Sequence, residues 1–344
     1  MLLSIIIPTR NEEQYIKNCI ESIYEQNFLK ENEFEIIIAD GDSTDSTLKI
    51  IKKIQLDFNN IFLIKNSKRY MPIGFNKGLS IARGKYILML GAHSQIKEDF
   101  LKNALRIIKE KKCDCVSGIL ITKQKNFTGK IISKVQSSFF GVGGVKFRNE
   151  NLKHGMYSDT GVFGLYNRKV FKLIGGLDEE LIRNQDDEFN FRLIQNQGKI
   201  WVDPSIKTIY FARSTLSSLI KQYFQYGFYK VRVFQKRGGV ASWRHLVPAF
   251  FVISIFLSFY VKNYSLILLY TILNCIFSIK ELIFLKKISK FEMFKAIYLF
   301  PITYLMIHLS YGFGTIFGFV YFFSNWNNVQ IVDTHFNKNK VNDK

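Results

Sequence analysis

A run of five apolar residues from Tyr86 to Leu90 most constrains the fold of this chain, because Gly91-Ala92-His93-Ser94 follows it directly. A short, unbroken apolar run is typical of a strand buried on both faces, as found inside a parallel sheet. Ligands of open α/β sheets gather at the carboxyl ends of such strands. The run therefore predicts a buried strand with a candidate functional histidine, His93, just past its end. The alternative is a surface turn with an idle histidine.

Strand-like and helix-like segments alternate four times over about the first 120 residues. This alternation predicts an α/β fold with a doubly wound, mostly parallel sheet. Asn11 is the expected N-cap of the first helix, with acidic residues behind it to favour the positive end of the helix dipole. The expected strands are 2–7, 35–39, 61–64, 86–90 and 115–120, and the expected helices are 11–26, one from residue 44 or 45, 72–83 and 98–111.

The pattern becomes irregular between residues 123 and 158, and we interpret Gly141-Val-Gly-Gly144 as a loop that lines an acceptor cleft. It lacks the GxGxxG spacing of a dinucleotide site. A helix is predicted over 186–197, with Asp186-Asp187-Glu188 at its N-terminus. Carboxylates at this end of a helix complement its dipole, so a purely structural role is the alternative to a catalytic one.

Three largely apolar runs, at 246–261, 264–279 and 296–323, predict a C-terminal region of membrane helices, followed by a polar tail at 324–344. Only the third run is long enough to span a bilayer outright. Lys286, Lys287, Lys290 and Lys295 separate the second and third runs, and further cations precede the first. Cationic loops favour the cytoplasmic face. The first two runs then form a hairpin, and the third crosses outward or folds back. The alternative is a buried helical domain of a soluble protein.

The net charge of +20 suggests an anionic surface nearby, either nucleic acid or acidic lipid. No RNA-binding motif is present, so we expect acidic membrane lipid and no nucleic acid. The four cysteines show no metal-ligand spacing and are expected to be reduced. The N-terminus has no basic signal-peptide region and reads as a first strand, which predicts a cytoplasmic N-terminal domain. The oligomeric state is not indicated.

Three motifs in order resemble those of family 2 glycosyltransferases of the GT-A fold. They are Ile5-Ile-Ile-Pro-Thr-Arg-Asn-Glu12, Ile36–Thr47 with its Asp40-Gly-Asp-Ser-Thr-Asp sequence, and Gly74-Phe-Asn-Lys-Gly78 through Ala82–Ile87. The apolar tail and Phe140–Gly144 are similar to membrane-attached transferases of succinoglycan and exopolysaccharide biosynthesis. The resemblance implies a glycosyltransferase domain at 1–235, with a nucleotide-sugar half at about 1–122 and an acceptor half at about 123–235.

This resemblance implies a nucleotide-diphosphate sugar donor, most often UDP-linked, and a lipid-linked saccharide acceptor. The matching positions place Asp40 against the nucleotide base, where a carboxylate accepts a hydrogen bond from a uracil N–H. Asp45 has a competing interpretation as a helix cap. The other implied donor contacts are Pro8, Arg10, Glu12, Asn76 and Lys77, with Arg69 as a candidate phosphate contact.

The family's Asp-x-Asp metal motif corresponds here to Gly91-Ala92-His93, so His93 inherits the contact to a divalent cation, Mn²⁺ or Mg²⁺. Imidazole is an acceptable ligand for Mn²⁺ and a less natural one for Mg²⁺. Gly91 replaces the first carboxylate of the motif. This departure keeps a second hypothesis open, in which the protein is a weakly active or inactive membrane scaffold that binds nucleotide or partner subunits.

The resemblance also assigns the general base. Asp186 aligns with the family's catalytic aspartate, and Asp187 is the alternative. A carboxylate beside the acceptor hydroxyl removes its proton during attack on the anomeric carbon. We therefore expect an inverting transferase of the plasma membrane, multi-pass, with its catalytic domain in the cytoplasm. His308, inside the third apolar run, is either functional or part of a helix–helix hydrogen bond.

Overall fold

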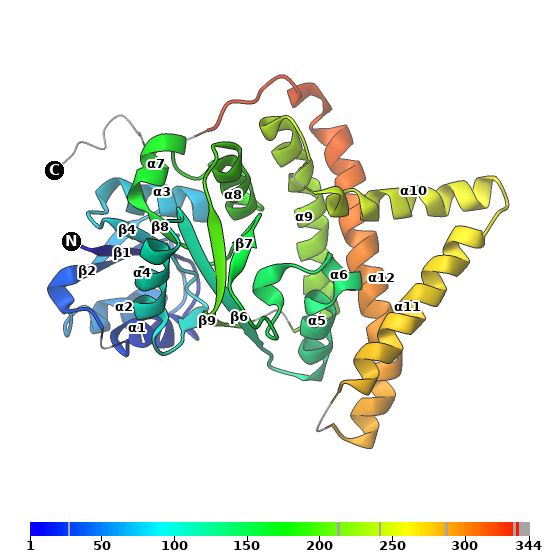
Figure 1. Cartoon of the computed structure of the whole chain (residues 1–344), viewed down its shortest axis with the longest axis horizontal. Coiled ribbons are helices and arrows are strands. Elements are labelled where there is room, and N and C mark those ends of the chain that lie inside the picture. Colours follow the sequence, from blue (N-terminus) through cyan, green and yellow to red (C-terminus); the bar gives the residue numbers. More distant parts are fainter. Residues whose placement is uncertain (27, 212–213, 241, 286–287, 333–334, 337–344) are drawn as a thin grey trace. The chain divides into compact units, whose positions relative to one another are not determined.

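The computed structural model describes residues 1–26, 28–211, 214–240, 242–285, 288–332 and 335–336. The chain forms two compact units. The first contains Met1–Ile121, Asn149–Tyr210 and the described part of Ile331–Lys344, and the second contains Thr122–Arg148 and Phe211–Gln330. Figure 1 labels the elements of both.

A nine-stranded sheet forms the centre of the first unit in the described residues, in the order β3-β2-β1-β4-β8-β6-β9-β5 with β7 on β9. β3, β2, β1 and β4 are parallel, whereas β8 pairs antiparallel with β4 and β6, and β5 and β7 pair antiparallel with β9. The strands are β1 Leu3–Thr9, β2 Phe34–Asp40, β3 Ile61–Lys65, β4 Tyr86–Met89, β5 Ser94–Ile96, β6 Cys115–Lys123, β7 Met156–Ser158, β8 Leu165–Asn167 and β9 Ile200–Phe211.

The α/β class is confirmed, but the sheet is mixed where the sequence predicts a mostly parallel one. The reason lies in the connections. Parallel neighbours need a crossover of a dozen or more residues. β5 begins five residues after the end of β4, so it cannot pair parallel beside it and joins β9 instead. The parallel part is the segment in which strands and helices alternate.

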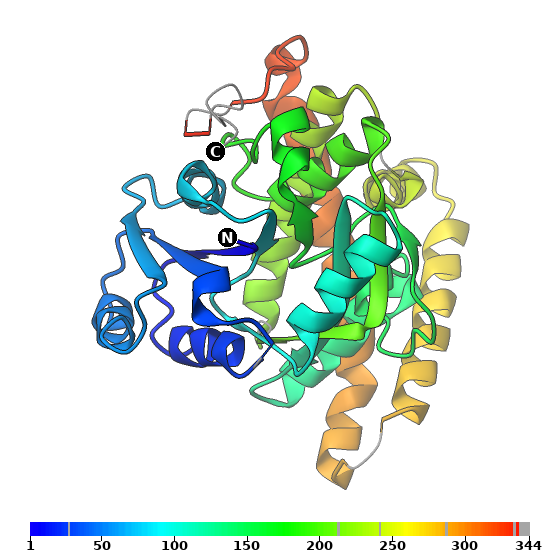
Figure 2. The same cartoon turned by 60° about the vertical axis from the view of Figure 1, so that its left-hand side comes forward.

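Helices cover both faces of this sheet. Ile5 and Ile7 of β1 point into a core shared with α1 and α4, whereas Ile6 points into a second core with α3, α7 and α8. Alternate residues of a strand face opposite sides, so a continuous apolar run is what two covered faces require. Figure 2 shows α3 on the opposite face from α1 and α2. The helices are α1 Ile16–Tyr24, α2 Thr47–Ile54, α3 Met71–Ile81, α4 Phe100–Glu110, α7 Arg168–Ile174 and α8 Gln185–Gln195.

Two local predictions are wrong. Asn11 does not cap α1, which begins at Ile16, because Asn11 adopts a φ of 54° and its side-chain oxygen accepts the N–H of Thr44. The irregular stretch after residue 123 contains two helices, α5 Phe127–Ser137 and α6 Phe139–Val142, so Gly141 is helical. Gly143, at φ 76°, ends α6 in the left-handed conformation that glycine adopts at little cost.

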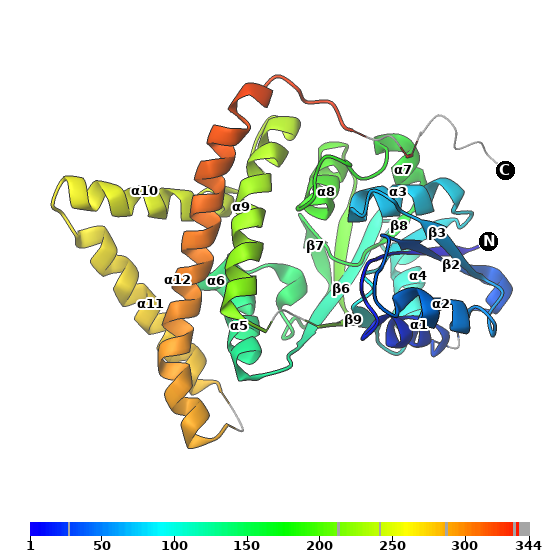
Figure 3. The same ribbon diagram turned by 180° about the vertical axis from the view of Figure 1, so that it is seen from behind.

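The second unit consists of helices. α9 Leu216–Arg237 and α12 Lys290–Tyr321 lie side by side along their lengths (Figures 1 and 3). Glycines permit this approach: a Cβ at Gly227 would lie 2.1 Å from the carbonyl oxygen of Tyr311, and one at Gly314 would lie 2.1 Å from that of Phe224. Small residues at such contacts are typical of helices that pack within membranes.

The described residues contain two helices long and apolar enough to cross a membrane, α11 Ser265–Ile283 and α12. α10 Val247–Tyr260 is apolar but has 14 residues, which is short of a span. Many large apolar side chains of α10 and α11 are exposed. Lys286 and Lys287 of the predicted cationic cluster lie outside the described residues.

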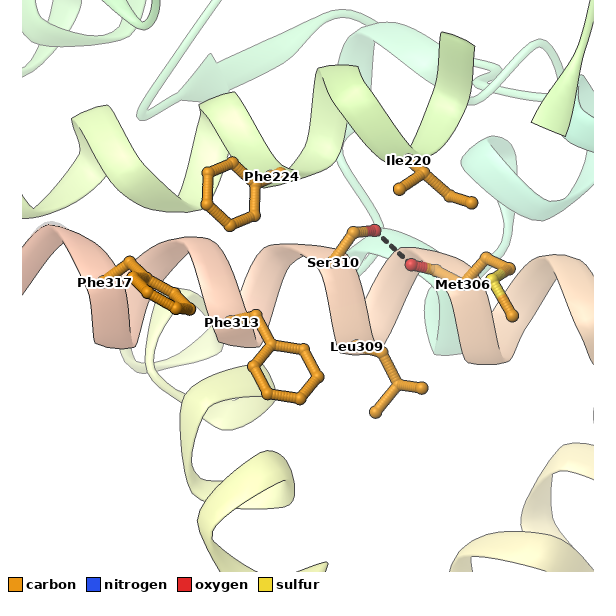
Figure 4. A pocket seen from close by; sticks show the side chains of 7 residues that line it. All are labelled: Ile220, Phe224, Met306, Leu309, Ser310, Phe313 and Phe317. Carbon is orange, nitrogen blue, oxygen red and sulfur yellow. Dashed lines mark hydrogen bonds between the residues drawn. The ribbon is translucent and has the colours of Figure 1, made fainter. Parts of the chain in front are cut away.

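An apolar groove of about 310 Å³ runs between α9 and α12 (Figure 4).

His308 joins three elements of this second unit. Its Nε2 lies 2.9 Å from the carbonyl oxygen of Phe140 in α6, and its Nδ1 lies 3.0 Å from the hydroxyl of Tyr270 in α11. Of the two interpretations of His308, the structure confirms the helix–helix hydrogen bond. Tyr304 adds a bond from its hydroxyl to Ser138 Oγ, 3.0 Å away.

The predicted polar tail divides between the two units: residues 324–330 belong to the second unit, and the described residues from 331 onward pack on the first. The backbone N–H of Glu179 donates to the carbonyl oxygen of Val332 at 2.7 Å, and His335 Nδ1 lies 2.8 Å from Glu179 Oε2. Phe336 is 4% exposed and belongs to the core beneath α3. The rest of the predicted tail, 337–344, lies outside the described residues.

Candidate active site

Two loops at the carboxyl ends of β1 and β2 hold each other in place. The side chain of Asn11 accepts from the backbone of Thr44 at 2.9 Å, and that of Glu13 accepts from the backbone of Ser46 at 2.9 Å. Asp45 accepts from the backbone of Glu13 at 3.2 Å and from that of Thr47 at 3.0 Å. Although burial opposes it, these hydrogen bonds lower the pKa of Asp45. The N-cap of α2 is Ser46, so Asp45 lies one residue before the cap and contacts the first residue of the helix, Thr47.

Asp40 ends β2 at the floor of this loop pair and is buried. Its carboxylate accepts from the backbone N–H of Ser43 at 3.0 Å and from the hydroxyl of Ser43 at 2.6 Å. Asp40 pairs in register with Thr9, at the end of β1. Pro8 and Arg10 flank Thr9 in the sequence and therefore lie beside the end of β2. Pro8 is half-buried and Arg10 is exposed. The sheet thus brings these three predicted residues to one edge.

Glu12 and His93 form the most direct contact between predicted site residues. Oε1 of Glu12 lies 3.0 Å from Nδ1 of His93, whose side chain is 35% exposed. The imidazole also packs against Tyr210, with ring centroids 5.1 Å apart. A carboxylate at Nδ1 fixes the tautomer that leaves the lone pair on Nε2, the form in which histidine binds metals.

Family 2 glycosyltransferases generally use a divalent cation, and the residues here fit one only in part. Among the described residues no cluster of three or more His, Cys, Asp or Glu side chains is able to hold a metal. His93, oriented by Glu12, supplies one ligand suited to Mn²⁺. Any cation bound here would therefore take most of its ligands from the donor diphosphate and water.

The absence of a side chain at Gly91 has a structural explanation. A Cβ at this position would lie 2.9 Å from Cε1 and 3.3 Å from Cζ of Phe163, so the aromatic ring fills the space of a side chain. The carbonyl oxygen of Gly91 accepts from the hydroxyl of Ser94 at 2.5 Å. The first carboxylate of the metal motif is thus replaced by an aromatic ring from another loop.

The remaining predicted donor contacts lie apart from this group. Lys77 Nζ donates to the carbonyl oxygen of Lys65, the register neighbour of Asp40, at 3.1 Å. Arg69 Nη2 lies 2.5 Å from Asp42, and this hydrogen bond and charge lower the pKa of Asp42. Both side chains are about half exposed, so Arg69 is held in an ion pair at the surface.

Asn76 does not fit the predicted donor contact. It is 0% exposed, its Nδ2 donates to the carbonyl oxygen of Leu177 at 2.8 Å and to Glu179 at 3.0 Å, and its Oδ1 accepts from the N–H of Leu177. A direct contact to a nucleotide would require these bonds to break. Asn76 instead fixes α3 to the loop that also holds the C-terminal segment.

The three carboxylates at the start of α8 have different surroundings. Glu188 is fully buried and pairs with Arg192, which is 3% exposed, through two contacts of 3.0 Å. Arg192 also donates to the carbonyl oxygen of Gly176 at 2.7 Å. Asp186 and Asp187 are only half-buried, and Asp186 Oδ1 accepts the N–H of Asp187 at 2.9 Å. Glu188 is therefore structural, and the two aspartates remain the accessible carboxylates.

A short segment connects α8 with the end of β4. Asn190, one turn beyond Asp186, donates to the carbonyl oxygen of Gly161 at 3.0 Å. Two residues later in that segment, Phe163 lies against Gly91. Sequence reasoning missed Phe163 and Tyr210, since neither belongs to a motif. The one available signal was the absence of a side chain at Gly91.

Parallel strands that end in paired acidic loops, beside antiparallel strands in one mixed sheet, are consistent with the GT-A fold. The sequence model described as "Glycosyl transferase family 2" matches residues 4–175. The chain belongs to glycosyltransferase family 2, and it is a glycosyltransferase.

Curated relatives agree with this assignment. The chain is 40% identical over 233 residues, 65% of its length and 71% of the relative's, to a dolichyl N-acetyl-α-D-glucosaminyl phosphate 3-β-D-2,3-diacetamido-2,3-dideoxy-β-D-glucuronosyltransferase of Methanococcus voltae. It is 27% identical over 71% of its length and 73% of the relative's to the succinoglycan biosynthesis protein ExoA of Rhizobium meliloti. A crystal structure of S. aureus TarS 1–349 with UDP-GlcNAc, 20% identical, covers 68% of this chain and 67% of that one with a TM-score of 0.49.

Proposed function

We propose that this glycosyltransferase moves a sugar from a nucleotide-diphosphate donor, a UDP-sugar, to a lipid-linked saccharide with inversion at the anomeric carbon. The observation that carries the proposal is the gathering of Asp40, Glu12 and His93 at one edge of the parallel strands, where open α/β sheets bind ligands. The name of the Methanococcus voltae relative describes a sugar transfer to a lipid-phosphate-linked sugar, which supports this class of acceptor.

The donor half of the site has divided roles in this proposal. Asp40 accepts a hydrogen bond from the base, while Pro8 and Arg10 border the nucleotide from the next strand. Lys77 lies in α3, and its ammonium group reaches the carbonyl oxygen of Lys65 at the end of β3, beside Asp40. Arg69 exchanges Asp42 for a phosphate oxygen when the donor binds.

Asp186 is the proposed general base. The acceptor hydroxyl oxygen attacks the anomeric carbon, the bond from that carbon to the diphosphate oxygen breaks, and UDP leaves with the electron pair. The hydroxyl proton passes to the carboxylate of Asp186. Attack opposite the leaving group inverts the anomeric centre. Asp187 is the alternative base, since it is equally half-buried on the next residue of α8.

A divalent cation, when bound, neutralises charge that develops on the diphosphate. The protein would contribute the imidazole of His93, whose orientation is held by the contact between Glu12 and Nδ1.

We further propose that the enzyme is a multi-pass protein of the plasma membrane with its catalytic unit in the cytoplasm. Two helices of sufficient length and apolarity, with large apolar side chains exposed, support insertion. Residues 122–148 and 211–330 contain 16 described Lys and Arg but only Glu281 and Glu292 as acids, which favours contact with anionic lipid headgroups.

The test is incubation of membranes that contain the protein with a panel of radiolabelled UDP-sugars and Mn²⁺ or Mg²⁺. We expect one donor to label the lipid fraction, or at least to be hydrolysed slowly. If no donor in the panel gives either product, the transferase proposal loses its support. Membranes with Asp186→Asn protein serve as the control for contaminating activities.

The second candidate is a weakly active or inactive membrane scaffold. Gly91 and the lack of a three-ligand cluster among the described residues favour it. Calorimetry with UDP separates the two, because a transferase should bind UDP more tightly with Mn²⁺ than without. A scaffold has no reason to show this dependence.

A further inference from the structure

Phe163 has a backbone conformation that an aromatic residue rarely adopts. Its φ is 49°, in the left-handed region. The neighbours impose it: the hydroxyl of Ser117 donates to the carbonyl oxygen of Val162 at 2.7 Å and accepts its N–H at 3.0 Å, and Met89 donates to the carbonyl oxygen of Gly164 at 3.1 Å. Strain that the surrounding structure holds in this way is concentrated at functional sites.

The conformation places the Phe163 ring at the end of β4. The ring occupies the space that any side chain at residue 91 would need, 2.9 Å from the ideal Cβ. Its centroid lies 6.3 Å from that of Tyr210, which in turn lies 5.1 Å from that of His93. Phe163 and Tyr210 are half-buried. Three rings therefore line the strand end that carries the proposed cation contact.

The same segment is tied to the helix that carries the proposed base. Asn190 of α8 donates to the carbonyl oxygen of Gly161 at 3.0 Å and to the hydroxyl of Thr160 at 3.3 Å. The reacting sugar must lie between the diphosphate and the base. The ring of Phe163 belongs to the chain segment that joins these two parts of the site.

We propose that Phe163, beside Tyr210 and His93, is the surface on which the C–H face of a pyranose stacks, and that this pyranose is the sugar transferred from the donor. This inference rests on the proposed function. Aromatic rings give a flat apolar surface that sugars contact through their C–H groups. The terminal sugar of the acceptor offers the same chemistry. The donor is favoured because the ring lies against Gly91, in the loop that holds His93.

The experiment measures affinities of the full-length protein in detergent, with Mn²⁺, for UDP, UDP-N-acetylglucosamine and UDP-glucuronic acid. We expect Phe163→Leu to lower the affinity for each sugar nucleotide that the wild type binds. The loss should be about three- to tenfold, whereas the affinity for UDP should change less than twofold. Phe163→Tyr keeps the ring and should retain wild-type affinities. Phe58→Leu removes a ring that stacks on Tyr24 away from these residues and is the matched control.

Gly91→Ala gives a second route to the same result, because its Cβ displaces the ring without removing it. This variant should also lower the affinity for sugar nucleotides more than the affinity for UDP. The inference would be overturned if Phe163→Leu lowered the affinities for UDP and sugar nucleotides equally, or lowered neither. The same would follow from a change confined to the KM for the lipid acceptor, or a wild type that binds UDP but neither sugar nucleotide. Failure of the wild type to bind UDP at all would instead remove the proposed function.

Discussion

Glu12 and His93, which are 81 residues apart in the sequence, meet at 3.0 Å where β1 and β4 end side by side. The contact joins a nucleotide-binding motif to the position of a metal motif. Supporting carboxylates of this kind typically account for 10- to 100-fold in metal affinity. Glu12 therefore belongs to the candidate cation site as much as to the donor loop.

We expect Glu12→Gln to raise the Mn²⁺ concentration needed for tight UDP binding by about tenfold, because an amide orients the imidazole less strongly than a carboxylate. The measurement is UDP affinity by calorimetry across a Mn²⁺ titration. Glu21→Gln, at an exposed i,i+4 pair with Lys17, is the control. An unchanged Mn²⁺ requirement would separate Glu12 from the cation.

Asp186→Asn should lower the rate of transfer by a factor of about 100 to 10,000, the usual contribution of a general base, and leave UDP affinity unchanged. The measurement pairs single-turnover transfer with UDP calorimetry. Asp187→Asn tests the alternative and should have the smaller effect. A larger loss in Asp187→Asn than in Asp186→Asn would reverse their roles.

Gly91→Asp tests the replaced metal motif. The ring of Phe163 stands 2.9 Å from the new Cβ, so we expect the single variant to unfold at a lower temperature without binding Mn²⁺ more tightly. In Gly91→Asp with Phe163→Ala, the space is open and Mn²⁺ affinity should rise. If the single variant already binds Mn²⁺ more tightly, the ring is not the obstacle.

Removing Arg192 should destabilise the catalytic unit by about 3–5 kcal/mol, because Arg192→Met leaves the carboxylate of Glu188 buried without its charged partner. Thermal unfolding of the detergent-solubilised protein measures this. The double variant with Glu188→Leu should recover much of the loss, since no charge remains buried. Arg106→Met, at an exposed pair with Glu110, is the control and should be nearly neutral.

Thiol labelling tests insertion of α11. Burial raises the pKa of Cys19 to about 12 and that of Cys113 to about 11, so at pH 8 both remain protonated and should react slowly. Cys275 in α11 is exposed on the protein surface. In intact vesicles we expect a water-soluble maleimide to miss Cys275, and after denaturation in SDS to label it. Rapid labelling in vesicles would mean that this face of α11 contacts water.

Periodicity predicted those parts of the fold that depend on local pattern. The strands of the parallel half have continuous apolar runs because both faces are covered, so Ile5, Ile6 and Ile7 all read as buried. The antiparallel half could not be predicted in the same way, because β5, β7 and β8 have only three residues each and their pairing depends on distant chain segments.

The candidate site also has a part that local sequence pattern predicts and a part that depends on distant chain segments. Asp40, Glu12 and His93 follow strands, so their common edge was predictable from the parallel arrangement. The burial of Asn76 was not predictable, because a buried amide and an accessible one look alike in sequence and its partners lie about 100 residues away. Phe163 was missed for a related reason, since only the fold shows which ring fills the space at Gly91.

The attachment of Val332 and Phe336 to the catalytic unit has a topological consequence for the helices that precede them. The chain leaves that unit after Tyr210 and rejoins it at residue 331, so both ends of the helical segment are on the same side of any bilayer. The number of crossings between these points is therefore even. If the helices cross a bilayer as proposed, α11 and α12, the two candidate spans among the described residues, would supply one crossing in each direction.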